Sequence, residues 1–535
     1  MKKILFNILL FFLIFPSFVY GQEGLLKVRI DRFDGGMNSF GMADSLQPNQ
    51  FASLSNVILN RPGVLSKRKG QDLFNTDTGS TAFTGVGRFD PDATTSYLVT
   101  ASGTRVARST LSASTWTLAN PNNALTTGKT TEFVQADDLL FVLNGFDNTA
   151  WYDGATWDQG GTYPTSPPVA TTGAWLRNYL FLAGATTEND WVYVSNNLVP
   201  QTFTASDIIK INTGDGQKIQ HLEPFRLDEL IVYKERSIFV LDISGSAISG
   251  WTVQPISTVI GTIAPKSVVS LGNDHWFLSS EPIAVRSLVR TEFDKILVNR
   301  ISDSIQDIFD GTGRVTINKT HISKATAILF DNKYFIAVPT GTSTVNNLIA
   351  VFDFITSGWS LISGWFPSDW VVVGNRLFYI DANDGSVIEC FASDGGDFGE
   401  GPFVLTSATS PTQAIDYVVQ SRIIDFDQPE NFKGLDALEV EFDPTGNYNA
   451  DVYINLDNEG WTSIGTVSLA AYGLTLPFTL PSPLSNTGVA RKTFHLQKYD
   501  EVKDIQIMIR QNWLDQEVNL RRITIFARSK PWRRE

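Results

Sequence analysis

Short apolar runs and turns alternate along most of the chain. Between residues 80 and 398 an apolar run is followed by a turn of Gly, Asn or Asp, then a second apolar run and often a Trp. Apolar runs bounded by turn residues are typical of buried β-strands. The clearest pairs of runs are 97–100 with 104–107, 139–143 with 150–154, 179–182 with 191–194, 230–233 with 237–241, 333–338 with 348–353, and 376–381 with 385–388.

These hairpins recur at intervals of roughly 40 to 60 residues, close to the repeat length of β-propeller blades. One small sheet cannot cover both of its faces, whereas sheets packed radially bury one another. We therefore predict an all-β fold with a β-propeller of about five to seven irregular blades over residues 80–400. The stretch 290–325 departs from the hairpin pattern and predicts a helical insertion between blades.

From about residue 402 the pattern changes to longer runs in which apolar and polar residues alternate strictly. Such alternation means that one face of a strand is buried and the other is wet. We therefore predict a C-terminal β-sandwich over residues 401–535. Its strands are expected at 417–426, 437–442, 450–456, 504–510 and 522–527. Residues 22–79 are expected to form an extended lead-in to the propeller, with one strand near 56–59 and a Pro-Gly turn after it.

Residues 1–21 look like a targeting segment. Lys2 and Lys3 precede an apolar run over 4–20, and Gly21 leads into a polar stretch. This order is typical of a secretory signal peptide, and the short run with Pro16 near its end fits a membrane span less well. Three interpretations stay open: a cleaved signal, a retained apolar anchor, and a start site placed too far upstream.

Composition supports the all-β assignment. Aromatic residues make up 12% of the chain, with 36 Phe and 13 Trp against 4 Met, and Gly numbers 41. Such a mixture suits short strands and tight turns better than long helices. The net charge of −14 argues against nonspecific binding of nucleic acid through a broad basic face. One basic cluster near the C-terminus is either a solvated tail or a local patch: Arg521, Arg522, Arg528, Lys530, Arg533 and Arg534.

Candidate metal or cofactor residues are sparse. The single cysteine, Cys390, cannot form an intramolecular disulfide, and its apolar neighbours predict a buried residue. None of the four histidines lies at metal-ligand spacing from another, so no metal or cofactor is predicted. These histidines are His221, His275, His321 and His495. The stretch 381–385 superficially resembles a calcium loop, but its carboxylate order differs and its last Glu ligand is missing, which predicts a hairpin turn.

Catalytic motifs are also missing from the sequence. Neither a G-x-S-x-G nucleophile elbow nor a phosphate-binding G-x-x-x-x-G-K-[ST] loop is present. We predict no catalytic residues and no enzymatic activity. A glycosidase with paired carboxylates stays open as an alternative, although no spacing singles out a pair.

Several phrases, in a fixed order, resemble a known family. They lie at 33–38 (FDGGMN), 46–52 (LQPNQFA), 54–57 (LSNV), 62–70 (PGVLSKRKG), 230–241, 256–269, 276–279 and 422–433. Together they resemble the tail nozzle proteins of short-tailed bacteriophages, also described as tail tubular protein B-like or tail hub proteins. The turn residues of this signature are Gly35, Gly36, Asn56, Pro62, Gly63 and Gly70.

The resemblance implies a structural virion protein of the phage tail. Copies would form a homo-oligomeric ring below the portal and make part of a conduit for DNA ejection, in contact with the portal or adaptor and other tail proteins. An acidic wall repels phosphates, so DNA would pass without specific binding. The cationic cluster Lys67, Arg68 and Lys69 is the candidate contact with a neighbouring subunit or the adaptor.

The export-like segment departs from this family, because such virions assemble in the cytoplasm. Either residues 1–21 are retained as an apolar element that contacts the host envelope, or a phage-derived gene serves a secreted bacterial protein. The alternative function is therefore a secreted or periplasmic propeller protein that binds a glycan or a protein partner.

Overall fold

The computed structural model describes residues 24–61, 63–75, 83–112, 115–120, 125–290, 296–393, 396–397, 413–470, 488–514 and 516–530. The predicted signal segment 1–21 and the signature residue Pro62 lie outside these residues. Within them no helix is both long and apolar enough to span a bilayer.

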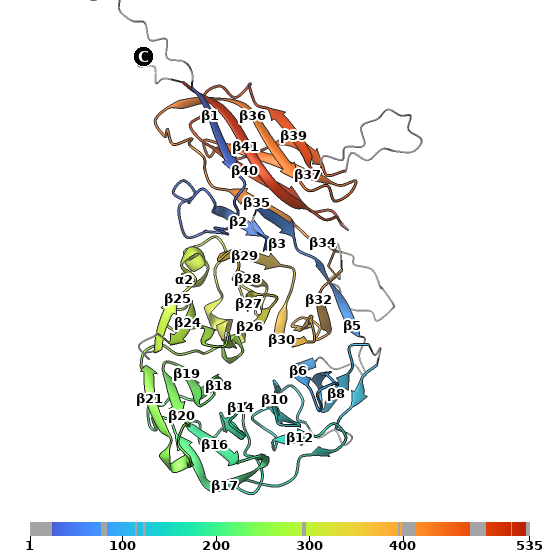
Figure 1. The fold of residues 1–535 in the computed structure, drawn as a ribbon, viewed down its shortest axis with the longest axis vertical. Helices are drawn as coiled ribbons and strands as arrows, with labels where there is room; N and C mark the ends of the chain where they lie inside the picture. The colour runs from blue at the N-terminus through green and yellow to red at the C-terminus, as the bar shows by residue number, and fades with distance from the viewer. Residues whose placement is uncertain are drawn as a thin grey trace, which may run out of the picture.

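Seven antiparallel four-stranded units surround a common axis in the described part of the chain, which confirms the predicted propeller (Figure 1). In six blades the strands follow chain order from the inside outwards. Blade 1 has β6 (Phe83–Phe89), β7 (Tyr97–Ser102), β8 (Arg105–Ser109) and β9 (Thr117–Leu118); blade 2 has β10 (Glu132–Ala136), β11 (Leu139–Leu143), β12 (Ala150–Tyr152) and β13 (Trp157–Asp158); blade 3 has β14 (Thr172–Leu176), β15 (Tyr179–Ala183), β16 (Trp191–Asn196) and β17 (Val199–Lys210). Blade 4 has β18 (Ile219–Arg226), β19 (Glu229–Lys234), β20 (Ile238–Asp242) and β21 (Thr252–Ser257); blade 5 has β22 (Val269–Ser270), β23 (Asp274–Leu278), β24 (Val285–Arg290) and β25 (Ile296–Arg300); blade 6 has β26 (Thr326–Phe330), β27 (Lys333–Val338), β28 (Leu348–Asp353) and β29 (Gly358–Ser363).

Blade 7 closes the ring with a strand from the other end of the propeller sequence. Its inner strands are β30 (Pro367–Val373), β31 (Arg376–Asp381) and β32 (Val387–Ser393), and its outermost strand is β5 (Gly70–Asn75). Leu73 of β5 lies opposite Ile388 of β32. Because β5 runs directly on towards β6 of blade 1, one chain segment joins the last blade to the first.

Neighbouring blades bury each other's apolar faces, as the hairpin pattern predicts. Val99 of blade 1 and Leu140 of blade 2 belong to one buried cluster. The same holds for Phe181 and Leu230 of blades 3 and 4 and for Tyr233 and Phe277 of blades 4 and 5. Each blade alone would leave such faces in water, so the blades stabilise one another.

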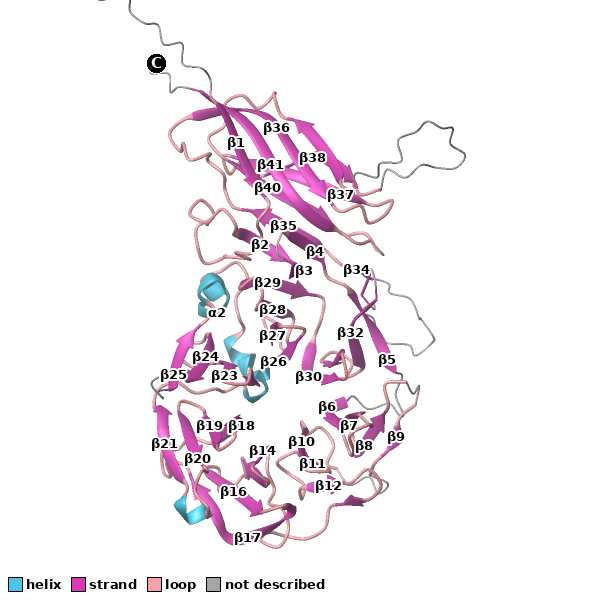
Figure 2. Ribbon diagram, in the orientation of Figure 1, coloured by secondary structure: helices cyan, strands magenta, loops and turns pink. Residues whose placement is uncertain are grey.

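The helical insertion predicted for 290–325 is confirmed as three short turns. They are η3 (Asp303–Ile305), α2 (Gln306–Asp310) and η4 (Lys319–Lys324), between β25 and β26 (Figure 2). Two further 3-10 turns, η1 (Ile248–Gly250) and η2 (Pro265–Ser267), precede the strands β21 and β22.

The remaining strands form two antiparallel sheets beside blades 6 and 7 (Figure 1), called here the C-terminal domain. One sheet contains β3 (Val57–Arg61), β4 (Val64–Lys67), β41 (Asn519–Lys530), β36 (Phe432–Phe442) and β39 (Ala490–His495), with β1 (Leu25–Ile30) also paired to β41; the other contains β2 (Phe51–Ser55), β35 (Tyr417–Ser421), β40 (Ile505–Gln511), β37 (Asn449–Leu456) and β38 (Trp461–Ser468). Leu438 and Val440 of the first sheet share a buried cluster with Val452 and Ile507 of the second. A short pair, β33 (Gly396–Asp397) with β34 (Gln413–Ala414), lies between this domain and the propeller.

The expected lead-in over 22–79 differs most from the structure. Its residues are not a separate extended arm: β1 to β4 belong to the sheets of the C-terminal domain, and β5 belongs to blade 7. The predicted sandwich is confined to 401–535, whereas both sheets here also include N-terminal strands. The physical reason is that β41 and β35 would otherwise leave edges unpaired, and β1, β4 and β2 pair with them.

One sheet is shared by the propeller and the C-terminal domain. Strand β2 lies next to β29 of blade 6, where Ser55 pairs in parallel with Leu361. The sheet of blade 6 therefore continues into the C-terminal domain as nine strands. This continuous ladder attaches the C-terminal domain to the outer rim of the propeller.

Candidate functional site

The signature turn at Gly35 and Gly36 packs against the outer strand of blade 6. Gly36 has φ +58°, and a Cβ there would lie 2.5 Å from Gly358 Cα. The next amide, Met37 N–H, donates to the carbonyl oxygen of Trp359 at 2.8 Å, while Gly35 packs against the backbone of Asn49. The close approach of two backbones, together with the positive φ, explains why glycine stands at position 36.

The side chain of Asn56 forms hydrogen bonds with both the propeller and the C-terminal domain. It lies between β2 and β3 with φ +55° and is buried. Its Nδ2 donates to Ser363 Oγ at 3.1 Å and to the carbonyl oxygen of Asp416 at 2.9 Å. Its Oδ1 accepts from Ser363 N–H at 3.1 Å and from Arg68 Nε at 2.9 Å. The oxygen and the nitrogen of this side-chain amide are therefore both hydrogen-bonded. Together they link blade 6, the C-terminal domain and the residue that follows β4.

Arg68 forms a buried ion pair with Asp397 at the same joint. Its Nη1 donates to Asp397 Oδ1 at 2.8 Å and its Nη2 donates to Asp397 Oδ2. Their side chains are 1% and 4% exposed. The guanidinium also lies 4.7 Å from the ring centre of Trp365, whose indole N–H donates to Asp397 Oδ1 at 3.1 Å. A bidentate, stacked geometry of this kind positions an arginine precisely and satisfies the buried carboxylate.

These placements correct the expectation for the cationic cluster. Lys67 is buried, and its Nζ donates to Gln511 Oε1 at 2.7 Å and to the carbonyl oxygen of Trp513 at 3.2 Å. Lys67 and Arg68 are therefore bonded within the chain, at positions that also line the cleft described below. Lys69 is the member of the cluster whose side chain is exposed. The sequence does not reveal this, because the amide that binds Lys67 and the carboxylate that binds Arg68 lie hundreds of residues away, at Gln511 and Asp397.

The other described signature glycines are Gly63 and Gly70. Gly63, with φ +82°, lies between β3 and β4, at the end of this hairpin opposite Asn56 and Arg68. Gly70 begins β5, where a Cβ would overlap the carbonyl oxygen of Gly396. Of the described signature residues, Gly35, Gly36, Asn56 and Gly70 thus lie where the chain connects the two domains, and Gly63 does not.

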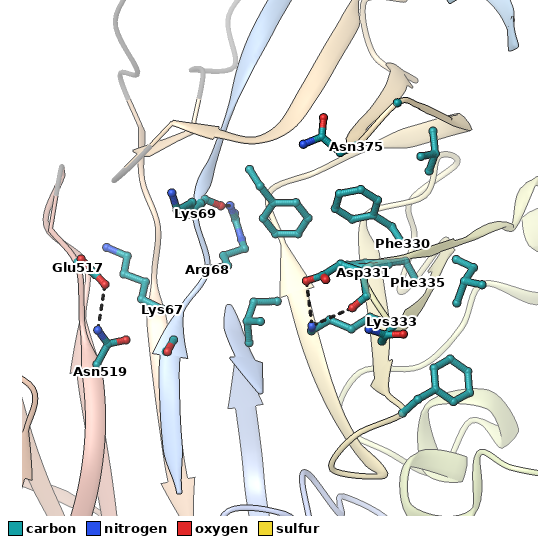
Figure 3. Close-up of a pocket in the computed structure, with 18 of the residues that line it drawn as sticks. Lys67, Arg68, Lys69, Phe330, Asp331, Lys333, Phe335, Asn375, Glu517 and Asn519 are labelled. Atoms are coloured by element: carbon teal, nitrogen blue, oxygen red, sulfur yellow. Dashed lines mark hydrogen bonds and ion pairs between the residues drawn. The ribbon is translucent and has the colours of Figure 1, made fainter. Parts of the chain in front are cut away.

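A cleft of about 1490 Å³ lies between the C-terminal domain and blades 5, 6 and 7 (Figure 3). Its apolar lining includes Phe330, Phe335, Phe354 and Phe391. Lys333 lies in this lining within 3.4 Å of the carboxylates of Asp331 and Asp353, so its charge is compensated. The polar part of the lining includes Asn332, Asn375, Glu517 and Asn519. A lining of apolar side chains with a few polar groups can bind a ligand or a side chain.

A second polar cluster, the axial cluster, lies where the inner strands meet. Thr172 Oγ donates to Glu132 Oε1 at 3.1 Å and lies 3.4 Å from His221 Nδ1, and His221 Nε2 lies 3.1 Å from Glu223 Oε2. These residues come from blades 2, 3 and 4. Burial raises the pKa of Glu132 although the nearby charge of His221 opposes this. Burial disfavours protonated His221, but the hydrogen bond to Glu223 and the charges of Glu132 and Glu223 outweigh it and raise its pKa.

An ion pair extends the axial cluster to blades 5 and 7. Lys266 Nζ, from η2 at the start of blade 5, lies 2.7 Å from Asp369 Oδ2 on β30 of blade 7. Its charge also acts on Glu132 of blade 2. Side chains of blades that are not neighbours therefore meet at the axis. The sequence does not reveal this cluster, because each blade contributes one or two ordinary polar residues.

The remaining candidate residues have structural surroundings. His275 is buried: its Nε2 lies 3.0 Å from the carbonyl oxygen of Pro224, and Tyr233 Oη lies 3.1 Å from its Nδ1. Cys390 is buried, as predicted, and burial raises the pKa of its thiol well above the usual range. The stretch 381–385 is the turn between β31 and β32, where Asp381 Oδ1 accepts from Asn383 N–H at 2.7 Å. Within the described residues no three His, Cys, Asp or Glu side chains are placed to hold a metal ion.

The C-terminal basic cluster forms ion pairs along β41. Arg522 pairs with Glu441, which also pairs with Arg491 at 2.5 Å, and Arg528 pairs with Asp436 at 2.8 Å. Arg521 pairs with Asp443 and Lys530 with Asp500. Arg533 and Arg534 lie outside the described residues. In the described part this cluster is a cross-strand charge ladder, and its cations are already compensated.

No protein-family model matches the chain, and no curated protein matches it. Among solved structures, the computationally designed Ika8 protein is similar at 11% identity and TM-score 0.36, over 60% of this chain and 99% of that one. YCF48 bound to D1 peptide is similar at 8% identity and TM-score 0.37, over 63% and 99% of the two chains. The Neurospora crassa Pan2 WD40 domain is similar at 10% identity and TM-score 0.36, over 61% and 97%. Similarities this low say nothing about function. The closed ring of seven blades itself identifies the chain as a β-propeller protein.

Proposed function

We propose that this protein is a structural subunit of a phage tail nozzle, which assembles into a ring that forms part of a conduit for DNA ejection. The proposal starts from the ordered phrases that resemble this family. The observation that carries it is the location of the N-terminal phrases: Gly36, Asn56, Arg68 and Gly70 lie at the contacts between the propeller and the C-terminal domain. A structural subunit needs its two domains held in a fixed arrangement, so its characteristic residues are expected at the contacts between the domains. In an enzyme they are expected around the reacting groups.

In this proposal the conduit lies between subunits. The axial cluster places Glu132, His221, Lys266 and Asp369 on the inner side of the blades, where Glu132 is electrostatically coupled to His221 and Lys266, and Lys266 pairs with Asp369. DNA would then run along the outer surfaces of several copies. The net charge of −14 supports sliding over binding, because like charges repel the phosphates.

Electron microscopy of the purified full chain tests the proposal. Closed rings of uniform subunit number in negative stain, alone or after mixing with portal and adaptor proteins, are expected. A monomer under all of these conditions would overturn it. The gene neighbourhood gives an independent test, since portal, terminase or capsid genes should lie beside this gene.

A secreted or periplasmic binding protein is the second candidate. Two observations favour it: the export-like sequence over 1–21 and the cleft with its floor of phenylalanines and its amides from Asn332, Asn375 and Asn519. Such a surface fits a glycan or a peptide. N-terminal sequencing of the mature protein separates the candidates, because a chain that begins after residue 21 has been exported.

A further inference from the structure

Arg286 is a buried cation on the third strand of blade 5. Its side chain lies on the same face of β24 as Leu288, which packs in a cluster with Phe225 and Tyr233 of blade 4. Arg286 therefore lies between blades 4 and 5, and only 8% of its surface is exposed. Burial on this scale is unusual for arginine unless an anion accompanies it.

The guanidinium of Arg286 has one protein partner among the described residues. Its Nε donates to the hydroxyl oxygen of Ser279 at 2.9 Å. No carboxylate of the described chain lies within ion-pair distance of it. Arg290, four residues along the same strand and on the same face, shows the contrast, because it pairs with Glu229. On the same face of the sheet, Arg290 therefore has an anionic partner among the described residues, and Arg286 has none.

A second arginine lies directly opposite. Arg300 of β25 is the register partner of Arg286, and side chains at such positions are roughly 5 Å apart at Cβ. Arg300 is half-exposed and pairs with Asp303. Burial, and then the charge of Arg300, lower the pKa of Arg286, yet a guanidinium stays charged at neutral pH. Like charges opposed across a strand pair destabilise a sheet, so this arrangement calls for an anion.

We infer that Arg286, with Arg300 and Ser279, forms a binding site for a small tetrahedral oxyanion such as phosphate or sulfate. The two terminal nitrogens of Arg286 match the spacing of two oxyanion oxygens, Arg300 supplies the second positive charge, and the Ser279 hydroxyl fixes the orientation of the Arg286 fork. Because only 8% of the surface of Arg286 is exposed, a free ion fits the site better than the backbone of a polymer. The anion would neutralise a charge buried between blades 4 and 5, and this role does not depend on the proposed function.

Thermal unfolding of the full chain in chloride and in phosphate, at equal ionic strength and pH, tests the site. Wild type should show a saturable rise in Tm with inorganic phosphate. R286M should lose this rise, with phosphate binding weakened at least tenfold by calorimetry, whereas R236M, at an exposed arginine of the β19–β20 turn, should keep it. In chloride alone R286M should be at least as stable as wild type, because methionine removes an uncompensated charge.

Two results would overturn the inference. One is a wild-type Tm that follows phosphate no differently from chloride. The other is equal phosphate affinity in R286M and R236M. If R286M fails to fold, R300M takes its place, since Arg300 is half-exposed and its loss should weaken phosphate binding without removing a core side chain.

Discussion

Asp397 accepts hydrogen bonds from both terminal nitrogens of Arg68, although the two residues are 329 positions apart in the sequence. The pair lies where β4 leads into β5, against the ring of Trp365 after blade 6. It therefore connects the C-terminal domain, blade 6 and blade 7 through one buried contact.

Replacing Arg68 with methionine should destabilise the protein strongly. The substitution leaves the Asp397 carboxylate buried without its cation, which typically costs about 3 to 5 kcal/mol. The free energy of unfolding from denaturant titration measures the loss. The control is K69M at the adjacent exposed position, expected to change stability by less than about 0.5 kcal/mol. Equal effects of the two substitutions would show that the pair does not support the joint.

Gly36→Ala and Gly341→Ala form a matched pair. Both glycines have nearly the same backbone conformation, φ +58° and +61°, but a Cβ meets Gly358 only at position 36 and open space at 341. G341A should cost about 1 kcal/mol from the left-handed backbone alone. G36A should cost about 2 to 5 kcal/mol, because the clash with blade 6 is added. Similar melting temperatures for the two variants would contradict the close packing of the Gly36 turn on blade 6.

His275 should make the protein less stable in mild acid. Burial lowers its pKa below the ordinary value of 6.5. The unfolded chain therefore binds more protons than the folded one as the pH falls below 6.5, and the free energy of unfolding decreases. H275Q should be less stable at neutral pH because it disturbs the contacts with Tyr233 and Pro224, but its stability should depend less on pH between about 7 and 5. Unchanged pH dependence would argue that His275 can be protonated in place.

His221 should have the opposite effect on the pH dependence of stability from that of His275. Its pKa is raised in the fold, so its stabilising contribution is complete below 6.5 and is lost as the pH rises through the folded-state pKa. H221Q should remove this decline. Melting temperatures of wild type, H221Q and H275Q across the same pH series distinguish the two histidines by the sign of their effect.

Cys390 should report on the opening of blade 7. It is the single cysteine of the chain, it is buried, and its thiol pKa is well above the usual range. A thiol-reactive dye should therefore label the native protein far more slowly than the denatured protein. R236M, at an exposed position of blade 4, is expected to leave this rate nearly unchanged, whereas Y379F, which removes the hydroxyl bonded to Gln71 of β5, should increase it. Rapid labelling of the native wild type would contradict the buried environment.

The blades could be predicted because their strands pair locally. The hairpin of Leu230–Tyr233 with Ile238–Leu241 needs only adjacent residues, and its apolar runs are visible in the sequence. The role of residues 25–75 could not be predicted in this way. Their partner strands, which lie between β29 and β41, are distant in the sequence. The apolar pattern of a strand does not indicate which other strand pairs with it.

The cationic cluster shows the same limit at the level of single residues. Lys67, Arg68 and Lys69 look alike in sequence, and a run of such residues is usually a solvated surface. In the structure Lys67 is buried beside Gln511 and Arg68 is buried beside Asp397, whereas Lys69 is exposed to solvent. The axial cluster and Arg286 are similar cases. The role of each charged residue depends on its neighbours, and only the closed ring brings these neighbours together.

The strand that completes blade 7 also dictates the order of events during synthesis. Residues 25–75 are synthesised before the blades, yet β5 has no partner until β32 has emerged, and β1 has none until β41 has been made. Strands β1 and β5 therefore remain unpaired while six blades are translated, with edges that favour aggregation. The ring can close once β32 has emerged, whereas β1 can pair only after β41 has been made, so a chaperone that holds the first strands would raise the yield of folded protein.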